Sequence, residues 1–121
     1  MKALLDTNII IDYLNGEQKA LQEISNYSKI YISVITYMEV LVGVGDSNKI
    51  ESIKDYLLSL NIVHIDQEIA DLAIEARKSY KLKIPDALVL ASAQKVSAIL
   101  VTRDKKDFST SIPIVRIPYS I

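Results

Sequence analysis

The sequence predicts an α/β fold in which helices cover both faces of a mainly parallel sheet of about five strands. Short apolar runs rich in Ile and Val alternate along the chain with longer stretches whose apolar residues have helical spacing. Half of the 121 residues are hydrophobic and the mean hydropathy is +0.20, as is typical of a sheet buried on both faces. A chain of this length without repeats or linkers is expected to form one domain over residues 1–121.

Five apolar runs are predicted to be strands: residues 2–5, 30–33, 62–65, 99–102 and 114–117. Three segments between them have helical spacing, marked by Leu21, Ile24 and Tyr27, by Ile50, Ile53 and Leu57, and by Ile69, Ala73, Ala76 and Tyr80. Asp66 stands where the third of these helices would be capped. Residues 87–96 are apolar almost all round, which fits a central helix packed on several sides.

The composition excludes several kinds of protein. The chain contains no cysteine, so disulfides, thiolate zinc sites and cysteine nucleophiles are ruled out. No apolar run approaches the length of a membrane span, about 18 residues, so we expect a soluble cytoplasmic protein with no membrane partner. The formal net charge of −1 gives no overall sign of nucleic-acid binding, although a local patch of Lys78, Lys81 and Lys83 can attract phosphates.

Four acids are predicted to reach one edge of the sheet. Asp6 follows the first predicted strand and Asp104 follows the fourth, so both emerge where parallel strands end. Glu39 and Asp86 lie near the starts of helices, and a crossover helix that runs antiparallel to its strands begins at that same edge. Gathered carboxylates repel one another and favour a bound cation. Oxygen ligands indicate Mg²⁺ or Mn²⁺ rather than zinc, and such ions assist phosphodiester hydrolysis by activating water.

Each of these acids also has an ordinary structural explanation. Asp6 is a good N-cap for the helix expected after it, and Asp86 suits the first turn of a helix behind a proline. Glu39 could be a solvated helix residue, and Asp104 and Asp107 suit a turn. The coincidence of the acids at one edge, rather than any one of them, favours the metal site.

Three further features are interpreted as structural. His64 lies in the apolar run NIVHI and is expected to be an interior residue rather than a base. Asp12 is placed off the helical face of Asn8 and is given no role in the site. The seven tyrosines are scattered and accompanied by one Phe and no Trp, which favours core and interface positions over a base-stacking platform.

Four segments resemble the motifs of PIN-domain ribonucleases, in particular the VapC-type toxins of prokaryotic toxin-antitoxin pairs: LLDTNIIIDYL, ISVITYMEVLVG, KIPDALVLASA and LVTRDKKDF. They occur in the family's order, span almost the whole chain and each contain an acid. The resemblance implies a three-layer α/β/α fold and an endonuclease of single-stranded RNA that depends on Mg²⁺, with Mn²⁺ as an alternative. It also implies a homodimer and a cognate VapB-like antitoxin that occupies the active-site groove.

The resemblance also assigns roles to residues by their position in the motifs. The family's acidic quartet falls on Asp6, Glu39, Asp86 and Asp104, of which Asp6, Asp86 and Asp104 are the implied metal ligands. Its small polar supports fall on Asn8 and Thr102. The last motif varies in the family, so Asp107 could share or take the role of Asp104.

Two other functions are compatible with this kind of fold. A receiver-type phosphoacceptor domain would show paired acids after the first strand and a Lys before Pro after the last, whereas Asp6 stands alone and Ile precedes each proline. A catalytically silent PIN-fold binding module would keep the acids only for an antitoxin's basic side chains. The high hydrophobic fraction independently predicts a homodimer, through helices beginning near Glu17 and Ser47.

Overall fold

The computed structural model describes residues 1–121 and contains one five-stranded sheet in the order β3-β2-β1-β4-β5, with every neighbouring pair parallel. The strands are β1 (Lys2–Leu5), β2 (Lys29–Ser33), β3 (Asn61–Val63), β4 (Ile99–Val101) and β5 (Val115–Arg116). β1 is central, with Leu4 opposite Tyr31 of β2 and Leu5 opposite Val101 of β4. The predicted fold class, an α/β fold with a mainly parallel sheet, is confirmed.

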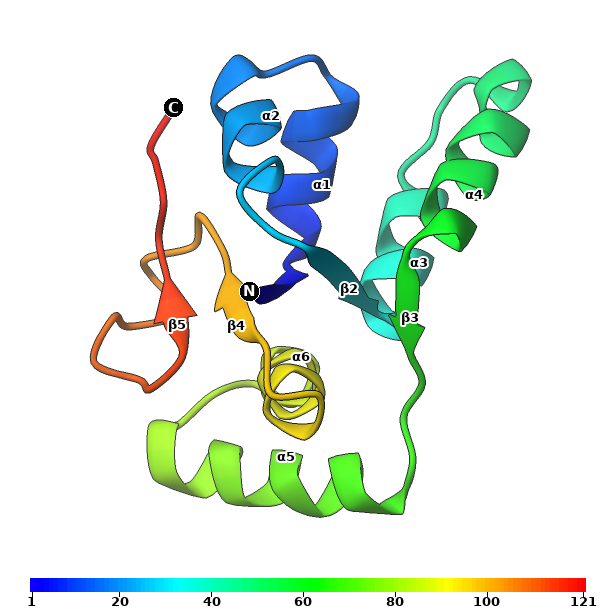
Figure 1. The fold of residues 1–121 in the computed structure, drawn as a ribbon. Coiled ribbons are helices and arrows are strands. Elements are labelled where there is room, and N and C mark those ends of the chain that lie inside the picture. The colour runs from blue at the N-terminus through cyan, green and yellow to red at the C-terminus, as the bar shows by residue number, and fades with distance from the viewer.

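Six α-helices cover the sheet: α1 (Thr7–Leu14), α2 (Gln18–Ile24), α3 (Val34–Val42), α4 (Ile50–Ser59), α5 (Gln67–Tyr80) and α6 (Ile84–Lys95). A short 3₁₀ helix, η1 (Ser47–Lys49), precedes α4. Figure 1 shows α5 and α6 on one face of the sheet and α1, α2, α3 and α4 on the other. The molecule therefore has three layers, α/β/α. None of its helices combines the length and the apolar character needed to cross a bilayer.

Alternate strand residues face the two helical layers, as the pleat requires. Leu4 and Leu100 belong to the core beneath α5 and α6, whereas Leu5 and Val101 belong to the core beneath α1, α3 and α4. All four side chains are fully buried. Because both faces are covered, the central strands read in the sequence as continuous apolar runs rather than as an alternating pattern.

Polar residues at strand ends cap the helices that follow. Asp6, Ser33 and, as predicted, Asp66 each accept a hydrogen bond from a backbone N–H in the first turn of α1, α3 and α5. In the first two cases no further residue separates the strand from the capped helix. These tight connections place the N-termini of α1 and α3 directly at the carboxyl edge of the sheet.

Only the first predicted strand matches at both ends: β2 begins one residue earlier than predicted, β4 ends one residue earlier, and β3 and β5 differ at both ends. The differences at β3 and β5 change how residues are interpreted. β3 ends at Val63, whose partner Ser33 is the last residue of β2, so the expected interior position of His64 is wrong and its side chain is exposed. β5 begins at Val115 because Ile114 has a φ of 69°, which a β-branched residue adopts only in a turn. In both cases the apolar run in the sequence continues beyond the residues that have a strand partner.

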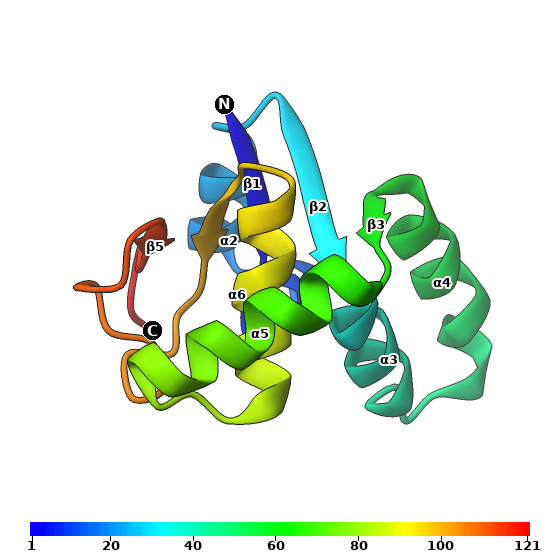
Figure 2. The same cartoon turned by 90° about the horizontal axis from the view of Figure 1, so that it is seen from below.

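The strand order reverses between β1 and β4, which is the topological switch point of the sheet. In Figure 2, β2 and β4 point toward the end of the molecule at which α3 and α6 begin. Ligands of open parallel sheets bind outside the carboxyl ends of the strands on either side of such a point. The observed order also differs from the 2-1-3-4-5 order of receiver-type domains, so that alternative is excluded by topology.

Candidate functional site

Asp6 occupies the switch point itself. Its backbone N–H donates to the Val101 carbonyl at 2.9 Å, which extends the pairing of β1 with β4 by one residue. Its carboxylate caps α1 through Oδ1, 2.9 Å from the Thr7 nitrogen, and accepts the Thr102 hydroxyl on Oδ2 at 2.8 Å. The residue is 8% exposed. Asp6 is therefore an N-cap, but only one of its oxygens caps the helix, and the other faces β4.

Asn8 and Thr102 hold Asp6 from two sides. The Asn8 amide nitrogen lies 3.3 Å from Thr102 Oγ1 and 3.5 Å from Asp6 Oδ2, while its oxygen accepts the Arg103 N–H at 3.0 Å. Thr102 Oγ1 also accepts the Asp104 N–H at 3.1 Å. The two residues assigned as polar supports therefore link α1 to the loop that follows β4.

Glu39 reaches the site through a residue that the sequence did not single out. Thr7 Oγ1 donates to Glu39 Oε1 at 2.6 Å, and Thr36 Oγ1 lies 3.0 Å from the same hydroxyl. Thr36 is fully buried, whereas Glu39 is exposed. Thr7 stands between Asp6 and Asn8 in the first motif, and this position is the one sequence signal that could have identified it.

Asp104 and Asp107 lie in one turn after β4, and their carboxylates have different hydrogen-bond partners. Asp104 Oδ1 accepts the N–H groups of Lys106 and Asp107, both at 3.0 Å, so one of its oxygens holds the turn. The Asp107 carboxylate makes no ion pair with any basic side chain. The structure therefore brings both candidates for the fourth acid to the same edge.

The charges of these acids act on one another. Burial raises the pKa of Asp6; hydrogen bonds from Thr102 and Thr7 oppose this, and the charges of Glu39 and Asp104 add to it. The pKa of Asp86, in the first turn of α6, is raised to about 6 by burial and then, in decreasing order, by the charges of Asp6, Asp107, Asp104 and Glu39. Every other acid at the edge thus raises the pKa of Asp86, and Asp107 raises it more than Asp104 does.

The donor chemistry fits a hard divalent cation, although the carboxylates are not arranged around one. The chain's three ion pairs are Lys95–Asp66, Arg103–Asp12 and Arg116–Glu23, so no basic side chain neutralises the acids at the switch point. Carboxylate and hydroxyl oxygens are the groups that Mg²⁺ and Mn²⁺ prefer. No three acidic or histidine side chains are placed to hold an ion together. The oxygens for such an ion would come from Asp6, Asp86 and Asp104, with Asp107, whose charges act on one another.

Asp12 is buried and contacts the loop of residues 102–107 after β4, here called the site loop, which corrects its predicted position. Asn8 and Asp12 are four residues apart on α1 and therefore lie on one face. Both contact Arg103, Asn8 through the Arg103 backbone and Asp12 through its side chain. The expectation that Asp12 lies off the Asn8 face is wrong, because α1 begins at Thr7 and residues four apart on a helix share a face.

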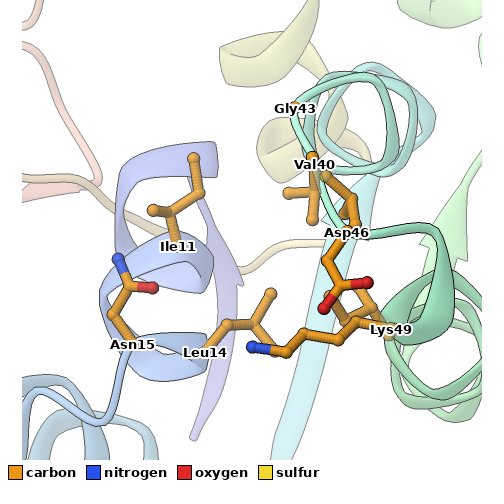
Figure 3. Close-up of a pocket in the computed structure, with 10 residues that line it drawn as sticks. Ile11, Leu14, Asn15, Val40, Gly43, Asp46 and Lys49 are labelled. Atoms are coloured by element: carbon orange, nitrogen blue, oxygen red, sulfur yellow. The ribbon is translucent and has the colours of Figure 1, made fainter.

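An open pocket of about 360 Å³ lies between α1 and the connection from α3 to α4. Figure 3 shows Ile11 and Leu14 on the α1 side, with Val40, Asp46 and Lys49 on the other. None of the clustered acids lines it. A second hollow, of similar size, borders the acids at Asp107 and is lined by two lysines and several hydroxyl groups: Lys81, Lys106, Ser79, Tyr80, Ser109 and Ser111.

The fold and the acids at its switch point define an α/β protein of the PIN type, and residues 3–110 match the PIN domain family. The chain belongs to that family. It is similar to a chain of a toxin-antitoxin complex from Klebsiella pneumoniae, with 42% identity and a TM-score of 0.92 over 98% of this chain and 99% of that one. These findings confirm the resemblance to VapC-type toxins that the four motifs predict.

More distant solved structures share the same architecture. VapBC2 from Rickettsia felis, bound to a promoter DNA fragment, matches at 25% identity and a TM-score of 0.75, covering 95% of this chain and 96% of that one. FitAcB from Neisseria gonorrhoeae matches at 23% identity and a TM-score of 0.79, covering 96% and 97%, and shows the fold alone. No curated protein sequence matches this chain.

The raised pKa of Asp86 predicts how stability depends on pH when no metal is bound. Below the ordinary value of 3.8 both the native and the unfolded state hold the proton. Between 3.8 and about 6 only the native state retains it, so Asp86 makes the protein less stable as pH rises through this window. With a chelator present, we expect Asp86→Asn to raise Tm by a few degrees near pH 7.5 and to leave it unchanged near pH 3.5.

Thermal unfolding followed by circular dichroism at both pH values measures this difference. Asp55→Asn, which removes an exposed acid on α4, is the matched control and should show no such dependence on pH. An Asp86→Asn gain in Tm that is equal at both pH values would contradict the electrostatic explanation.

Proposed function

We propose that this protein is a metal-dependent endoribonuclease that acts as the toxin of a toxin-antitoxin pair. The observation that carries the proposal is the set of acids at the switch point, which no basic residue of the chain neutralises. Membership of the PIN domain family and the similarity to a chain of a toxin-antitoxin complex support a nuclease of this kind. Mg²⁺ is the proposed cofactor, with Mn²⁺ as an alternative, because the donors are oxygens alone.

The residues of the chain prepare the site before any substrate binds. Thr102 and the Thr7 N–H fix both oxygens of Asp6, and the Thr7 hydroxyl orients Glu39. Asp86 and Asp107 have no ion-pair partner, so their oxygens are available to a cation. When bound, Mg²⁺ lowers the pKa of water and offsets the negative charge that develops on a phosphodiester during hydrolysis.

A polyanionic substrate also needs positive charge beside the acids. Lys81 and Lys106 line the hollow next to Asp107, and neither forms an ion pair within the chain. Lys83 lies three residues before Asp86 and is exposed. These lysines support a path for the RNA backbone across the connection from α5 to α6, close to the patch that the sequence predicts.

Asp6→Asn separates the catalytic interpretation of Asp6 from the capping one. Asn caps a helix about as well as Asp, so the variant should fold, with a Tm equal to or above that of the parent because repulsion among the acids is relieved. If Asp6 binds the metal, the loss of a charged oxygen ligand should slow RNA cleavage by about a hundredfold or more. The measurement is cleavage of total cellular RNA with and without Mg²⁺, followed by mapping of the new ends.

Asp66→Asn is the control, since Asp66 also caps a helix, α5, through the Ile69 N–H, and does not touch the switch point. It should cleave at the parental rate. An Asp6→Asn protein that cleaves as fast as the parent would refute the catalytic role of Asp6. A well-folded parent that cleaves no RNA would favour the silent binding module.

Replacing the two lysines tests the proposed RNA path. In an Asp6→Asn background, which prevents cleavage, Lys81→Ala and Lys106→Ala should each weaken binding of fluorescent single-stranded RNA at every sequence tried. Each should also reduce the slope of log Kd against log salt by about 0.7, as expected for one lost phosphate contact. Lys29→Ala is the control, because Lys29 begins β2 at the opposite edge of the sheet. Equal effects from all three variants would contradict the path.

The partner that we propose is a VapB-like antitoxin with an apolar segment and a basic side chain. The pocket between α1 and α3 offers Ile11, Leu14 and Val40, and the neighbouring Val42 is 87% exposed. A basic group of the partner beside the acids would form charge-assisted hydrogen bonds, which are stronger than those between neutral groups.

We also propose that the protein is a homodimer, as the high hydrophobic fraction predicts. A monomeric mass in light scattering would be evidence against the dimer.

Co-purification from the native host tests the antitoxin proposal. We expect a small protein to accompany the parent and to be released at high salt, because the contacts are charged. It should bind Asp86→Asn more weakly. The control is Asp55→Asn, which removes a charge away from the site and should retain the partner. Recovery of no small protein would count heavily against this proposal.

A further inference from the structure

Asp12 is a buried acid for which neither the sequence nor the proposed chemistry provides a function. It is 6% exposed, and its two oxygens accept three hydrogen bonds. Arg103 donates two of them, from Nε to Oδ2 at 2.8 Å and from Nη2 to Oδ1 at 3.0 Å. The Tyr119 hydroxyl donates the third, to Oδ2 at 2.8 Å. Such a paired arrangement fixes the arginine in direction as well as in distance.

Arg103 lies between Thr102 and Asp104, so its position sets the course of the site loop. Its backbone N–H donates to Asn8 at 3.0 Å while its side chain is held by Asp12. Asn8 and Asp12, one turn apart on α1, therefore hold the backbone and the side chain of Arg103, respectively. The next residue, Asp104, organises the turn that carries Asp107 through two N–H contacts.

We propose that Asp12 is a positioning residue for the candidate site: by holding Arg103 it fixes the backbone from which Asp104 and Asp107 project. Tyr119 holds the Asp12 carboxylate in the orientation that receives the arginine. The functional part of this inference rests on the proposed nuclease activity, because a fixed loop matters if its acids bind a metal. Groups that orient metal ligands commonly affect metal affinity and activity by about 10- to 100-fold.

The chain contains a matched control at another place. Glu23 on α2 is 5% exposed and accepts Arg116 in the same paired manner, from Nε at 2.8 Å and from Nη2 at 3.1 Å. It also accepts a tyrosine hydroxyl, that of Tyr27. None of these side chains contacts the acids at the switch point; Arg116 meets the site only through its backbone carbonyl, which accepts the Thr102 N–H at 3.1 Å as part of the strand pairing. Breaking this pair should destabilise the fold as much as breaking the Asp12 pair, but without moving the site loop.

Hydrogen exchange of the metal-free protein gives the first test. Asp12→Asn should accelerate exchange of the amides of residues 103–107 by about tenfold or more, while Glu23→Gln should leave these amides at the parental rate. Both variants should lower Tm. Tyr119→Phe, which removes one hydrogen bond and keeps the charges, should produce a smaller acceleration in the same segment. It provides the test if Asp12→Asn does not fold.

Metal binding and kinetics give the second test. Asp12→Asn should weaken Mn²⁺ binding, measured by calorimetry, by about 10- to 100-fold. It should lower kcat for single-stranded RNA by a similar factor and change KM less, because Lys81 and Lys83 lie outside the loosened segment and only Lys106 lies within it. Glu23→Gln should retain the parental Kd, kcat and KM. Arg103→Lys, which keeps the charge and loses the paired geometry, should resemble Asp12→Asn.

The outcomes separate this inference from the proposed function. Equal exchange of residues 103–107 in Asp12→Asn, Glu23→Gln and the parent would overturn the positioning role, whatever the activity. Accelerated exchange with parental Mn²⁺ affinity and kcat would overturn it too, because the loop would then be held for stability alone. A parent that binds Mn²⁺ but cleaves no RNA would refute the nuclease, while exchange and Mn²⁺ affinity would still decide the role of Asp12.

Discussion

The buried hydrogen bond from the Thr102 hydroxyl to Asp6 joins the two strand ends on either side of the switch point. It continues the pairing of β1 with β4, whose last contact is the Asp6 N–H on the Val101 carbonyl. α1 departs from Asp6, and the loop with Asp104 departs from Thr102. These two segments, far apart in the sequence, therefore share one anchor. Asp6 and Asp104 are held relative to each other through this anchor, whereas Glu39 and Asp86 project from α3 and α6.

The buried acids of the chain fall into two groups, those paired with an arginine and those that are not. Asp12 and Glu23 each receive a paired arginine and a tyrosine hydroxyl, which satisfies their charge inside the protein. Asp6 is just as buried but receives only hydroxyl, amide and backbone donors, so its charge is not neutralised. Arg103 is adjacent to the acids yet points to Asp12. The fold thus keeps basic side chains off the switch point and leaves its negative charge for an external cation or a basic partner.

Chain direction alone was enough to place Asp6, Glu39, Asp86 and Asp104 at one edge, because parallel strands and their crossover helices share a polarity. Strand ends were harder to predict, since apolar residues continue past the last paired position near His64. The buried ion pair of Asp12 was not predicted, because its partner Arg103 is 91 residues away in the sequence. Thr7 was missed for the same reason, as its contact with Glu39 spans 32 residues. Hydrogen bonds over such separations leave no periodic signal.

The segment after β4 connects the site to the end of the described chain. Arg116 and Tyr119 fasten it to α2 and α1, respectively, and Lys19 on α2 donates to the Ser120 carbonyl at 2.8 Å. In each contact one partner, Arg116, Tyr119 or Ser120, lies beyond residues 3–110, the region that matches the PIN domain family. Tyr119 and Arg103 share the Asp12 carboxylate, so a residue outside the region that matches the family takes part in the contacts that hold the site loop. The four motifs contain every acid of the site but not Tyr119, so they do not contain all the contacts that hold Asp12.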